Sequence, residues 1–300
     1  AGEVPQADDI TMLGLRYHGV TPSNVAAPVF RQTMPNQLMA IPDLQMAFEH
    51  YVAQWEAAKP LIPTLNMALD DLLNNVVQYA FPNDPTEHHI EVEGEVRDTW
   101  VIFTITDDGI PFNPLTVAPP DLSLLLHERE IGGLGIHLVR SMFDEVSYHR
   151  NVGRNVLTVK KKLAFTTSST TKPPDKTGIH AFDVERLPLP SHEDPRNIDK
   201  SVESRRSGAV MIVTPQARFD TNSSPGIERI LMDHIGQGER RIVLDLSHIS
   251  YISSIGLRVI LKAVKAMTRT DGKMVLCGGN DHVRTVLQLS GALMMSLYAS

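Results

Sequence analysis

Polar residues on one predicted helix are the first that could do chemistry. In LDDLLNNVVQYAF, residues 69–81, apolar residues recur at helical spacing and the polar residues fall on the opposite face. Asp71 and Asn75 are four residues apart, so their side chains lie on the same face, where they could share a metal ion or a polarised water. The alternative interpretation is the solvated face of an ordinary amphipathic helix.

A second cluster, TITDDGIPF at residues 104–112, places an aspartate at the end of a predicted strand. The carboxylate of Asp107 could accept a hydrogen bond from an exocyclic amine, and Gly109 would let such a ligand approach the backbone. An aspartate followed by x-Gly is also typical of a simple turn, and that alternative stays open.

A third cluster, EIGGLGIHLVR at residues 130–140, has three glycines at the start of a predicted helix. Backbone N–H groups and the helix dipole favour an anion such as phosphate there. No Lys-Ser or Lys-Thr follows, and Leu138 stands where a dinucleotide-binding fingerprint that began at Gly133 would need its third glycine. The alternative is a flexible loop that leads into a helix.

Two serines stand at a strand-to-helix junction near the end of the chain. In ISYISSIGLRVIL, residues 249–261, Ser253 and Ser254 separate an apolar strand-like run from an apolar helix-like run. They could form a helix cap or carry a phosphate, because both features are favourable at a helix N-terminus.

The composition limits the classes of protein to consider. The chain has 300 residues, enough for about two domains, with 42% hydrophobic and 21% charged residues, as in soluble globular proteins. A net charge of −7 argues against broad nucleic-acid binding, and no apolar run approaches the roughly 18 residues of a membrane helix. The single Cys277 excludes an intramolecular disulfide and suits a reducing cytosol, so we expect a cytoplasmic protein.

A Ser-, Thr- and Pro-rich stretch divides the chain. Residues 164–206 predict a linker between a domain at 31–163 and a domain at 207–300. In the first domain we expect a helix opened by Pro42, a helix over 61–80, mostly antiparallel strands and a helix over 134–143, which indicates an α/β sandwich. In the second, alternating strands and helices predict a small α/β domain with at least one crossover unit.

The order of these clusters resembles the histidine-kinase-like (GHKL) ATPase fold, in the form found in anti-sigma-factor serine kinases. Residues 153–163, GRNVLTVKKKL, look like the final strand of that family, and residues 113–131 would be its lid. The resemblance implies these roles at an ATP site: Mg²⁺ ligation by Asn75, recognition of the adenine amino group by Asp107, packing beside the base by Gly109, cradling of phosphates by Gly133 and Gly135, and a contribution on the adenine side by Asn155.

The second domain resembles the STAS domain of anti-anti-sigma factors, which those kinases phosphorylate on a serine at a helix start. The usual Asp-Ser-x-Gly reads Ser253-Ser254-Ile255-Gly256 here, so the resemblance makes Ser254 the phosphoacceptor. One residue departs from the kinase pattern: Asp71 stands where the family has a general-base glutamate, and its side chain is one methylene shorter. This departure affects catalysis more than nucleotide binding.

The resemblances together imply a bacterial partner-switching regulator: an ATP- and Mg²⁺-dependent serine kinase fused to a STAS domain, controlling a sigma factor or similar regulator. Anti-anti-sigma proteins and a second copy of the chain are further implied partners. The alternative, favoured by Asp71, is a non-catalytic ATP-binding scaffold that sequesters a regulator.

Residues 7–19, ADDITMLGLRYHG, resemble the closing strand of metal-dependent serine/threonine phosphatases, with Asp8 as a metal ligand. We therefore expect residues 1–30 to be the remnant of a preceding phosphatase-like domain in a longer polypeptide.

Overall fold

The structure is a computed structural model that describes residues 29–82, 84, 86–121, 133–163, 202–292 and 298–299. The phosphatase-like fragment with Asp8, most of the expected lid and nearly all of the expected linker lie outside the described residues. Within the described part of the chain, none of the helices is both long and apolar enough to cross a membrane.

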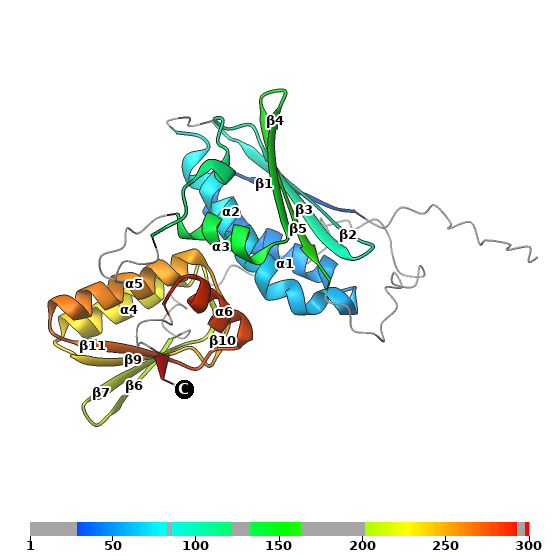
Figure 1. Cartoon of the computed structure of the whole chain (residues 1–300). Helices are drawn as coiled ribbons and strands as arrows, with labels where there is room; N and C mark the ends of the chain where they lie inside the picture. The colour runs from blue at the N-terminus through cyan, green and yellow to red at the C-terminus, as the bar shows by residue number, and fades with distance from the viewer. Residues whose placement is uncertain are drawn as a thin grey trace, which may run out of the picture.

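The N-terminal domain is an antiparallel sheet covered on one face by helices (Figure 1). The strand order is β1-β2-β3-β5-β4, and the strands are β1 (Phe30–Pro35), β2 (His89–Arg97), β3 (Trp100–Asp107), β4 (Glu145–Asn151) and β5 (Arg154–Lys162). Alternate residues of β2 and β3 are buried, because successive side chains of a strand point to opposite faces. The predicted α/β sandwich is confirmed.

Three α-helices cover this sheet: α1 (Ile41–Val52), α2 (Ile62–Tyr79) and α3 (Leu134–Met142). Short 3-10 turns precede these helices: η1 (Leu38–Ala40) before α1, η2 (Glu56–Leu61) before α2 and η3 (Pro114–Thr116) before α3. Pro42 stands in the first turn of α1, where its missing N–H costs nothing. Phe48 of α1 packs edge-on against Phe103 of β3, which fixes the helix layer on the sheet.

The C-terminal domain is a mainly parallel sheet with helices, as predicted. Its strand order is β12-β11-β9-β7-β6, and the strands are β6 (Val202–Ser207), β7 (Val210–Pro215), β9 (Arg241–Asp245), β11 (Lys273–Cys277) and β12 (Tyr298–Ala299). β7, β9, β11 and β12 are parallel, whereas β6 forms an antiparallel edge. β6 begins at Val202, so residues 202–206 belong to this domain and not to the linker.

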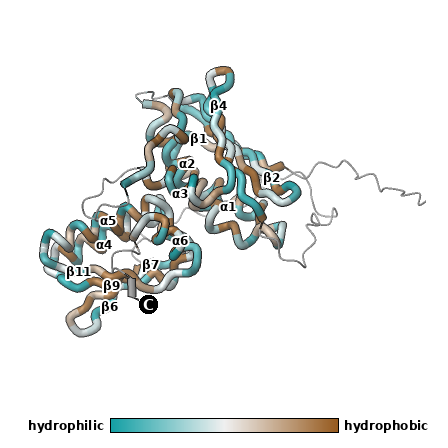
Figure 2. The backbone as a smooth tube through the Cα atoms, in the orientation of Figure 1, coloured by the Kyte–Doolittle hydropathy of each residue, from teal (hydrophilic) through white to brown (hydrophobic). Residues whose placement is uncertain are grey.

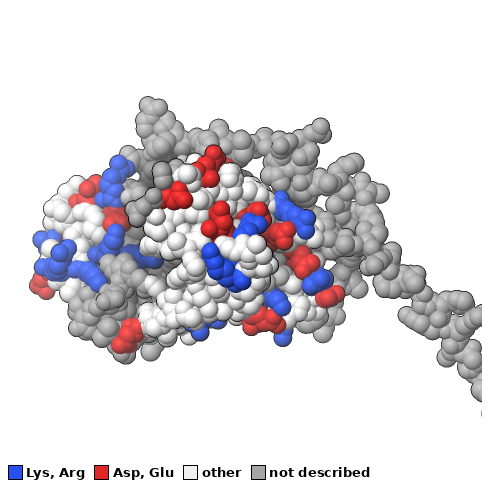
Figure 3. Space-filling model, turned by 90° about the horizontal axis from the view of Figure 1, so that it is seen from above, with Lys and Arg blue, Asp and Glu red and all other residues white. Residues whose placement is uncertain are grey.

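Helices α4 (Ser224–Gly236) and α5 (Ser254–Arg269) lie side by side on one side of this sheet, and α6 (Asp281–Leu289) follows β11 (Figure 1). A separate parallel pair, β8 (Ala217–Phe219) with β10 (Ile249–Ile252), leads into α5. Hydrophobic and hydrophilic residues alternate along α5 (Figure 2), as expected of a helix with one buried face. On the face in Figure 3, acidic and basic side chains of the described residues are interspersed.

Candidate functional site

The N-terminus of α5 lies against α2 of the other domain. The backbone N–H of Ser254 donates a hydrogen bond of 3.0 Å to Oδ1 of Asp71. Ser253 occupies the N-cap position, yet its side chain makes no capping hydrogen bond. A carboxylate from the neighbouring domain therefore takes the place of a local cap, where the helix dipole favours a negative charge.

Gly135 of α3 completes the contact between Asp71 and Ser254. A Cβ atom built on this glycine would lie 3.0 Å from Oγ of Ser254 and 3.1 Å from Cβ and Cγ of Asp71. The hydroxyl, the carboxylate and the first turn of α3 therefore surround one point. A side chain at position 135 would push the Ser254 hydroxyl and the Asp71 carboxylate away from α3.

The carboxyl group of Asp71 is poised to exchange a proton near neutral pH. Burial raises its pKa to about 6, while hydrogen bonding by Ser254 and the positive charge of Arg258 lower it. Its Oδ1 is bonded to α5, whereas its Oδ2 is buried and has no hydrogen-bond partner among the described residues. An acceptor oxygen without a partner beside a serine hydroxyl has the chemistry of a general base.

The polar face of α2 is not a solvated face. Asp70, Asp71 and Asn74 are 1%, 2% and 4% exposed. Thr221 and Ser254 of the second domain contact Asp70 and Asp71. The alternative interpretation of this helix is therefore wrong for these three residues. Asn75 is half-buried and lines the neighbouring cavity described below.

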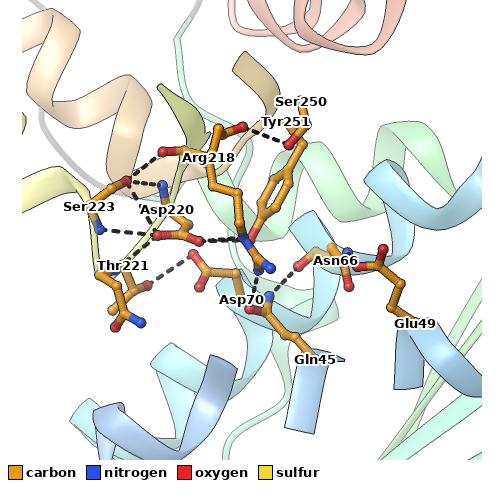
Figure 4. A network of polar contacts seen from close by, with 12 residues as sticks. Gln45, Glu49, Asn66, Asp70, Arg218, Asp220, Thr221, Ser223, Ser250 and Tyr251 are labelled. Atoms are coloured by element: carbon orange, nitrogen blue, oxygen red, sulfur yellow. Dashed lines mark hydrogen bonds and ion pairs between the residues drawn. The ribbon is translucent and has the colours of Figure 1, made fainter. Parts of the chain in front are cut away.

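A buried polar network joins the two domains beside this contact (Figure 4). Arg218 donates to Oε1 of Gln45 on α1 at 2.7 Å and forms an ion pair with Asp220 at 2.8 Å. Thr221 donates to Oδ2 of Asp70 at 2.9 Å. Burial and the nearby charges of Asp220 and Asp71 raise the pKa of Asp70 to about 8, so this carboxyl group is mostly protonated at pH 7.

A cavity of about 110 Å³ lies beside the C-terminal half of α2. Its lining is mostly apolar and includes a few polar groups, and comprises Leu72, Asn75, Val76, Tyr79, Ala80, Ile105, Asp107, Ile110, Phe112, Pro114, Tyr148, Asn155 and Leu157. Asn75 and Asp107 thus face one cavity although they are far apart in the sequence. Few polar groups in an apolar lining are typical of a small-molecule site.

Hydrogen bonds fix the Asp107 carboxylate in this cavity. Asn155 donates to its Oδ1 at 2.8 Å and the N–H of Gly109 donates to the same atom at 2.9 Å. Tyr148 and Arg150 both donate to the side-chain oxygen of Asn155, which fixes the orientation of its amide. Desolvation raises the pKa of Asp107, and the hydrogen bonds from Asn155 and Gly109 oppose that shift.

The structure gives Gly109 a reason other than ligand approach. A Cβ atom there would lie 2.5 Å from Cβ and 2.6 Å from the carbonyl oxygen of Ala80, at the end of α2. The next residue, Ile110, donates its N–H to that carbonyl at 2.8 Å. The absence of a side chain at 109 therefore lets β3 close onto α2, and in this way it shapes the cavity.

Gly133 stands at the N-cap of α3 with a φ of 71°, in the left-handed region that glycine adopts without strain. It borders a second cavity, of about 250 Å³, together with His137, Arg140 and Ser141 of α3 and residues 117–119. Arg140 donates to the carbonyl oxygens of Leu115 and Val117, so it ties the start of the expected lid to α3.

Several residues of the inter-domain contact were not predicted from the sequence: Gln45, Asp70, Arg218, Asp220, Thr221 and Tyr251. Each is an ordinary polar residue in its local sequence. Within the C-terminal domain, Tyr251 accepts from Arg218 and donates to Asp220. The docking of the two domains, which the sequence does not specify, brings this group to Gln45 and Asp70.

Comparisons with known proteins agree with this architecture. Residues 34–161 match the histidine kinase-like ATPase domain family and residues 201–300 match the STAS domain family. In Bordetella bronchiseptica, BtrV, described as an anti-sigma factor antagonist, is 39% identical over 84 residues, which cover 28% of this chain and 72% of BtrV. The serine/threonine-protein kinase BtrW of the same organism is 34% identical over 102 residues, which cover 34% of this chain and 70% of BtrW.

Among solved structures, an anti-sigma factor antagonist from Thermotoga maritima shares 22% identity over 35% of this chain and 91% of its own, with a TM-score of 0.33. The two sequence families and the two Bordetella relatives decide the classification. The chain belongs to the histidine kinase-like ATPases related to anti-sigma-factor serine kinases, and it carries in the same polypeptide a STAS domain of the anti-sigma factor antagonist type, the domain pair of a partner-switching regulator.

Proposed function

We propose that this chain is an ATP-dependent serine kinase that phosphorylates Ser254 of its own STAS domain. The observation that carries the proposal is the meeting of Asp71, Ser254 and Gly135 at the contact between the domains. Asp71 is shorter than the expected glutamate, but α5 comes close enough for its carboxylate to bind the backbone of the acceptor serine. The shorter side chain is therefore compatible with catalysis.

The residues around the cavity beneath α2 fit ATP and Mg²⁺. Both hydrogen bonds to Asp107 from described residues go to Oδ1, so its Oδ2 would accept from the adenine amino group. Asn75 follows Asp71 by one helical turn and would ligate Mg²⁺ through its amide oxygen, with phosphate oxygens as further ligands. No group of three or more His, Cys, Asp or Glu among the described residues could hold a metal alone, so the nucleotide would complete the site. Bound Mg²⁺ supplies charge neutralisation on the phosphates.

In the proposed reaction, Oγ of Ser254 attacks the γ-phosphorus and its proton passes to Oδ2 of Asp71. The bond from Oγ to phosphorus forms, the bond from the γ-phosphorus to the β–γ bridging oxygen breaks, and ADP leaves. Gly133 and Gly135 would direct N–H groups of the α3 N-terminus at the phosphates. Catalysis would rest mainly on positioning and on charge stabilisation.

The relatives support a role in the regulation of a partner protein. BtrV is described as an anti-sigma factor antagonist and BtrW as a serine/threonine-protein kinase. By analogy, phosphorylation of Ser254 would control which regulatory protein, a sigma factor or a comparable regulator, the chain binds. Free STAS proteins and a second copy of the chain are further candidate partners.

The test is incubation of the full chain with Mg²⁺ and γ-labelled ATP, followed by mass-spectrometric mapping of the label. We expect label on Ser254 that Ser254→Ala and Asp71→Asn abolish and that the matched control Ser253→Ala retains. A first-order rate constant independent of protein concentration would indicate transfer within one chain. ATP binding without label, on this chain or on an added STAS protein, would reject the kinase in favour of an ATP-binding scaffold.

A further inference from the structure

Arg258 lies one helical turn after Ser254 on α5. Residues four apart share one face of a helix, so the guanidinium group and the acceptor hydroxyl project to the same side. Arg258 is half-buried, and its Nε is buried without a hydrogen-bond partner among the described residues. A buried donor that is left unpaired is costly, so this arrangement indicates that a ligand completes it.

The positive charge of Arg258 already acts on the reacting groups. It lowers the pKa of Asp71, the carboxyl group that contacts Ser254. No ion pair joins the two side chains in the described part of the chain, whereas Lys262, one turn further along α5, is paired with Glu228 at 2.9 Å. The guanidinium group is thus near Asp71 without being neutralised by it.

A phosphoryl group is the ligand that fits this position. It is anionic, it must pass between the nucleotide and Ser254, and its oxygens match the planar donor fork of arginine. We propose that Arg258, which the STAS domain supplies, contacts the γ-phosphoryl group during its transfer to Ser254 and stabilises the negative charge there. This inference rests on the proposed kinase function and adds a catalytic residue from the substrate domain.

Arg258 takes no part in the transfer of bonds or protons. The proton of Ser254 passes to Asp71 and the leaving group is ADP, as above, while the guanidinium remains charged throughout. Its contribution is a pair of N–H donors aimed at oxygens whose charge grows as the phosphoryl group moves. A lysine could supply the charge but not the two parallel hydrogen bonds.

The first experiment compares single-turnover labelling of Ser254 in full-length wild type, Arg258→Ala, Arg258→Lys and the control Lys262→Ala at saturating Mg²⁺ and ATP. We expect Arg258→Ala to lower the rate constant about 100-fold or more, which is the usual effect of losing one such donor. Arg258→Lys should restore part of the rate, and Lys262→Ala should stay near wild type. ATP affinity, measured by calorimetry, should be almost the same in all four chains.

A second readout does not depend on turnover. Aluminium fluoride bound with ADP mimics the phosphoryl group in transfer, so wild type should bind the mixture more tightly than ADP alone, and Arg258→Ala should lose this gain. Labelling of Arg258→Ala at the wild-type rate would overturn the inference and leave the proposed function intact. A fall in melting temperature and in ADP affinity of that variant would also overturn it, in favour of a structural role. An unlabelled wild type would reject the proposed function itself.

Discussion

At the scale of single residues, the position of Ser254 compensates for the short side chain of Asp71, for which the resemblance to the kinase family implies a glutamate. The carboxylate loses one methylene of reach, but the N-terminus of α5 meets it and donates the N–H of Ser254 at 3.0 Å. The cost of burying the carboxylate appears in its pKa of about 6. A base with that value is ionised at pH 7 and still accepts a proton readily.

The pKa of Asp71 predicts how the labelling rate depends on pH. Only the ionised carboxylate accepts the serine proton, so the rate constant should rise with pH through a midpoint at about 6, which bound phosphates would raise and bound Mg²⁺ would lower. The measurement is single-turnover labelling of Ser254 between about pH 3.5 and pH 7, below the range in which we expect docking to weaken through Asp70. A midpoint near 4, the ordinary value of an aspartate, would contradict a buried Asp71 with a raised pKa as the group that sets the profile. Asp71→Glu should label Ser254 with a lower midpoint if its longer carboxylate is better solvated.

At the scale of elements, the absence of a side chain lets the N-termini of α3 and α5 meet the middle of α2. Gly135 lies in the first turn of α3, where its missing Cβ leaves room for both Asp71 of α2 and Ser254 of α5. Glycine disfavours a helix by roughly 1 kcal/mol relative to alanine. Alanine would remove this cost, but its methyl group would separate Asp71 from Ser254.

Gly135→Ala should therefore weaken transfer without harming the nucleotide cavity. Its methyl group would sit 3.0 Å from Oγ of Ser254 and force a shift of a few tenths of an ångström. Overpacking of this kind costs about 1–2 kcal/mol, so labelling should fall roughly 5- to 30-fold while ATP affinity is kept. The control is Gly236→Ala in α4, where a Cβ meets no atom within 4 Å. Equal labelling rates in the two variants would contradict this role for Gly135.

Most elements could be predicted from the sequence because their local patterns agree with their final environment. Pro42 in the first turn of α1 and the alternation along β2 and β3 are such patterns. β1 was not predicted, because FRQTMP contains a proline and little alternation. The predicted linker, residues 164–206, takes in all of β6 but Ser207. Only Val202 of this strand is buried, as in an exposed edge strand, so its sequence lacks the apolar pattern of a covered strand.

The candidate site was predictable in its parts but not in its assembly. Asp71, Asp107 and Ser254 follow from family motifs. The burial of Asp70 does not, because its environment is created by the docking of a second domain more than 100 residues away in sequence. A helical pattern reveals which residues share a face but not what covers it.

At the scale of the whole molecule, the two domains are joined by a polar contact that is sensitive to charge. Arg218 spans from Asp220 in its own domain to Gln45 in the other, and Asp70 lies beneath Thr221. Three carboxyl groups, Asp70, Asp71 and Asp220, are gathered in this buried region, and two arginines, Arg218 and Arg258, act on them. The contact is therefore most stable when one carboxyl group carries a proton.

Asp70 sets the pH range in which docking should weaken. Its pKa is about 8 in the docked chain against an ordinary value of 3.8, because of burial and the charges of Asp220 and Asp71. Asp70 binds its proton more tightly in the docked chain, so the protonated group stabilises docking. This stabilisation is complete below pH 3.8 and is lost as pH rises through 8, and over that range the docking equilibrium constant falls by up to about tenfold per pH unit. Asp71, with a pKa of about 6, adds a similar loss that is finished by about pH 7.

The window from pH 7 to 8.5 therefore isolates Asp70, and hydrogen exchange of the peptide that contains Ser254 measures docking in the full chain. After correction for the intrinsic pH dependence of exchange, protection in wild type should fall across this window. In Asp70→Asn, whose amide mimics the protonated acid, protection of this peptide should be higher than in wild type at pH 8 and nearly constant across the window. The control Asp233→Asn, at an exposed position of α4, should follow wild type. Parallel curves for wild type and Asp70→Asn would show that docking of the STAS domain does not depend on a proton at Asp70.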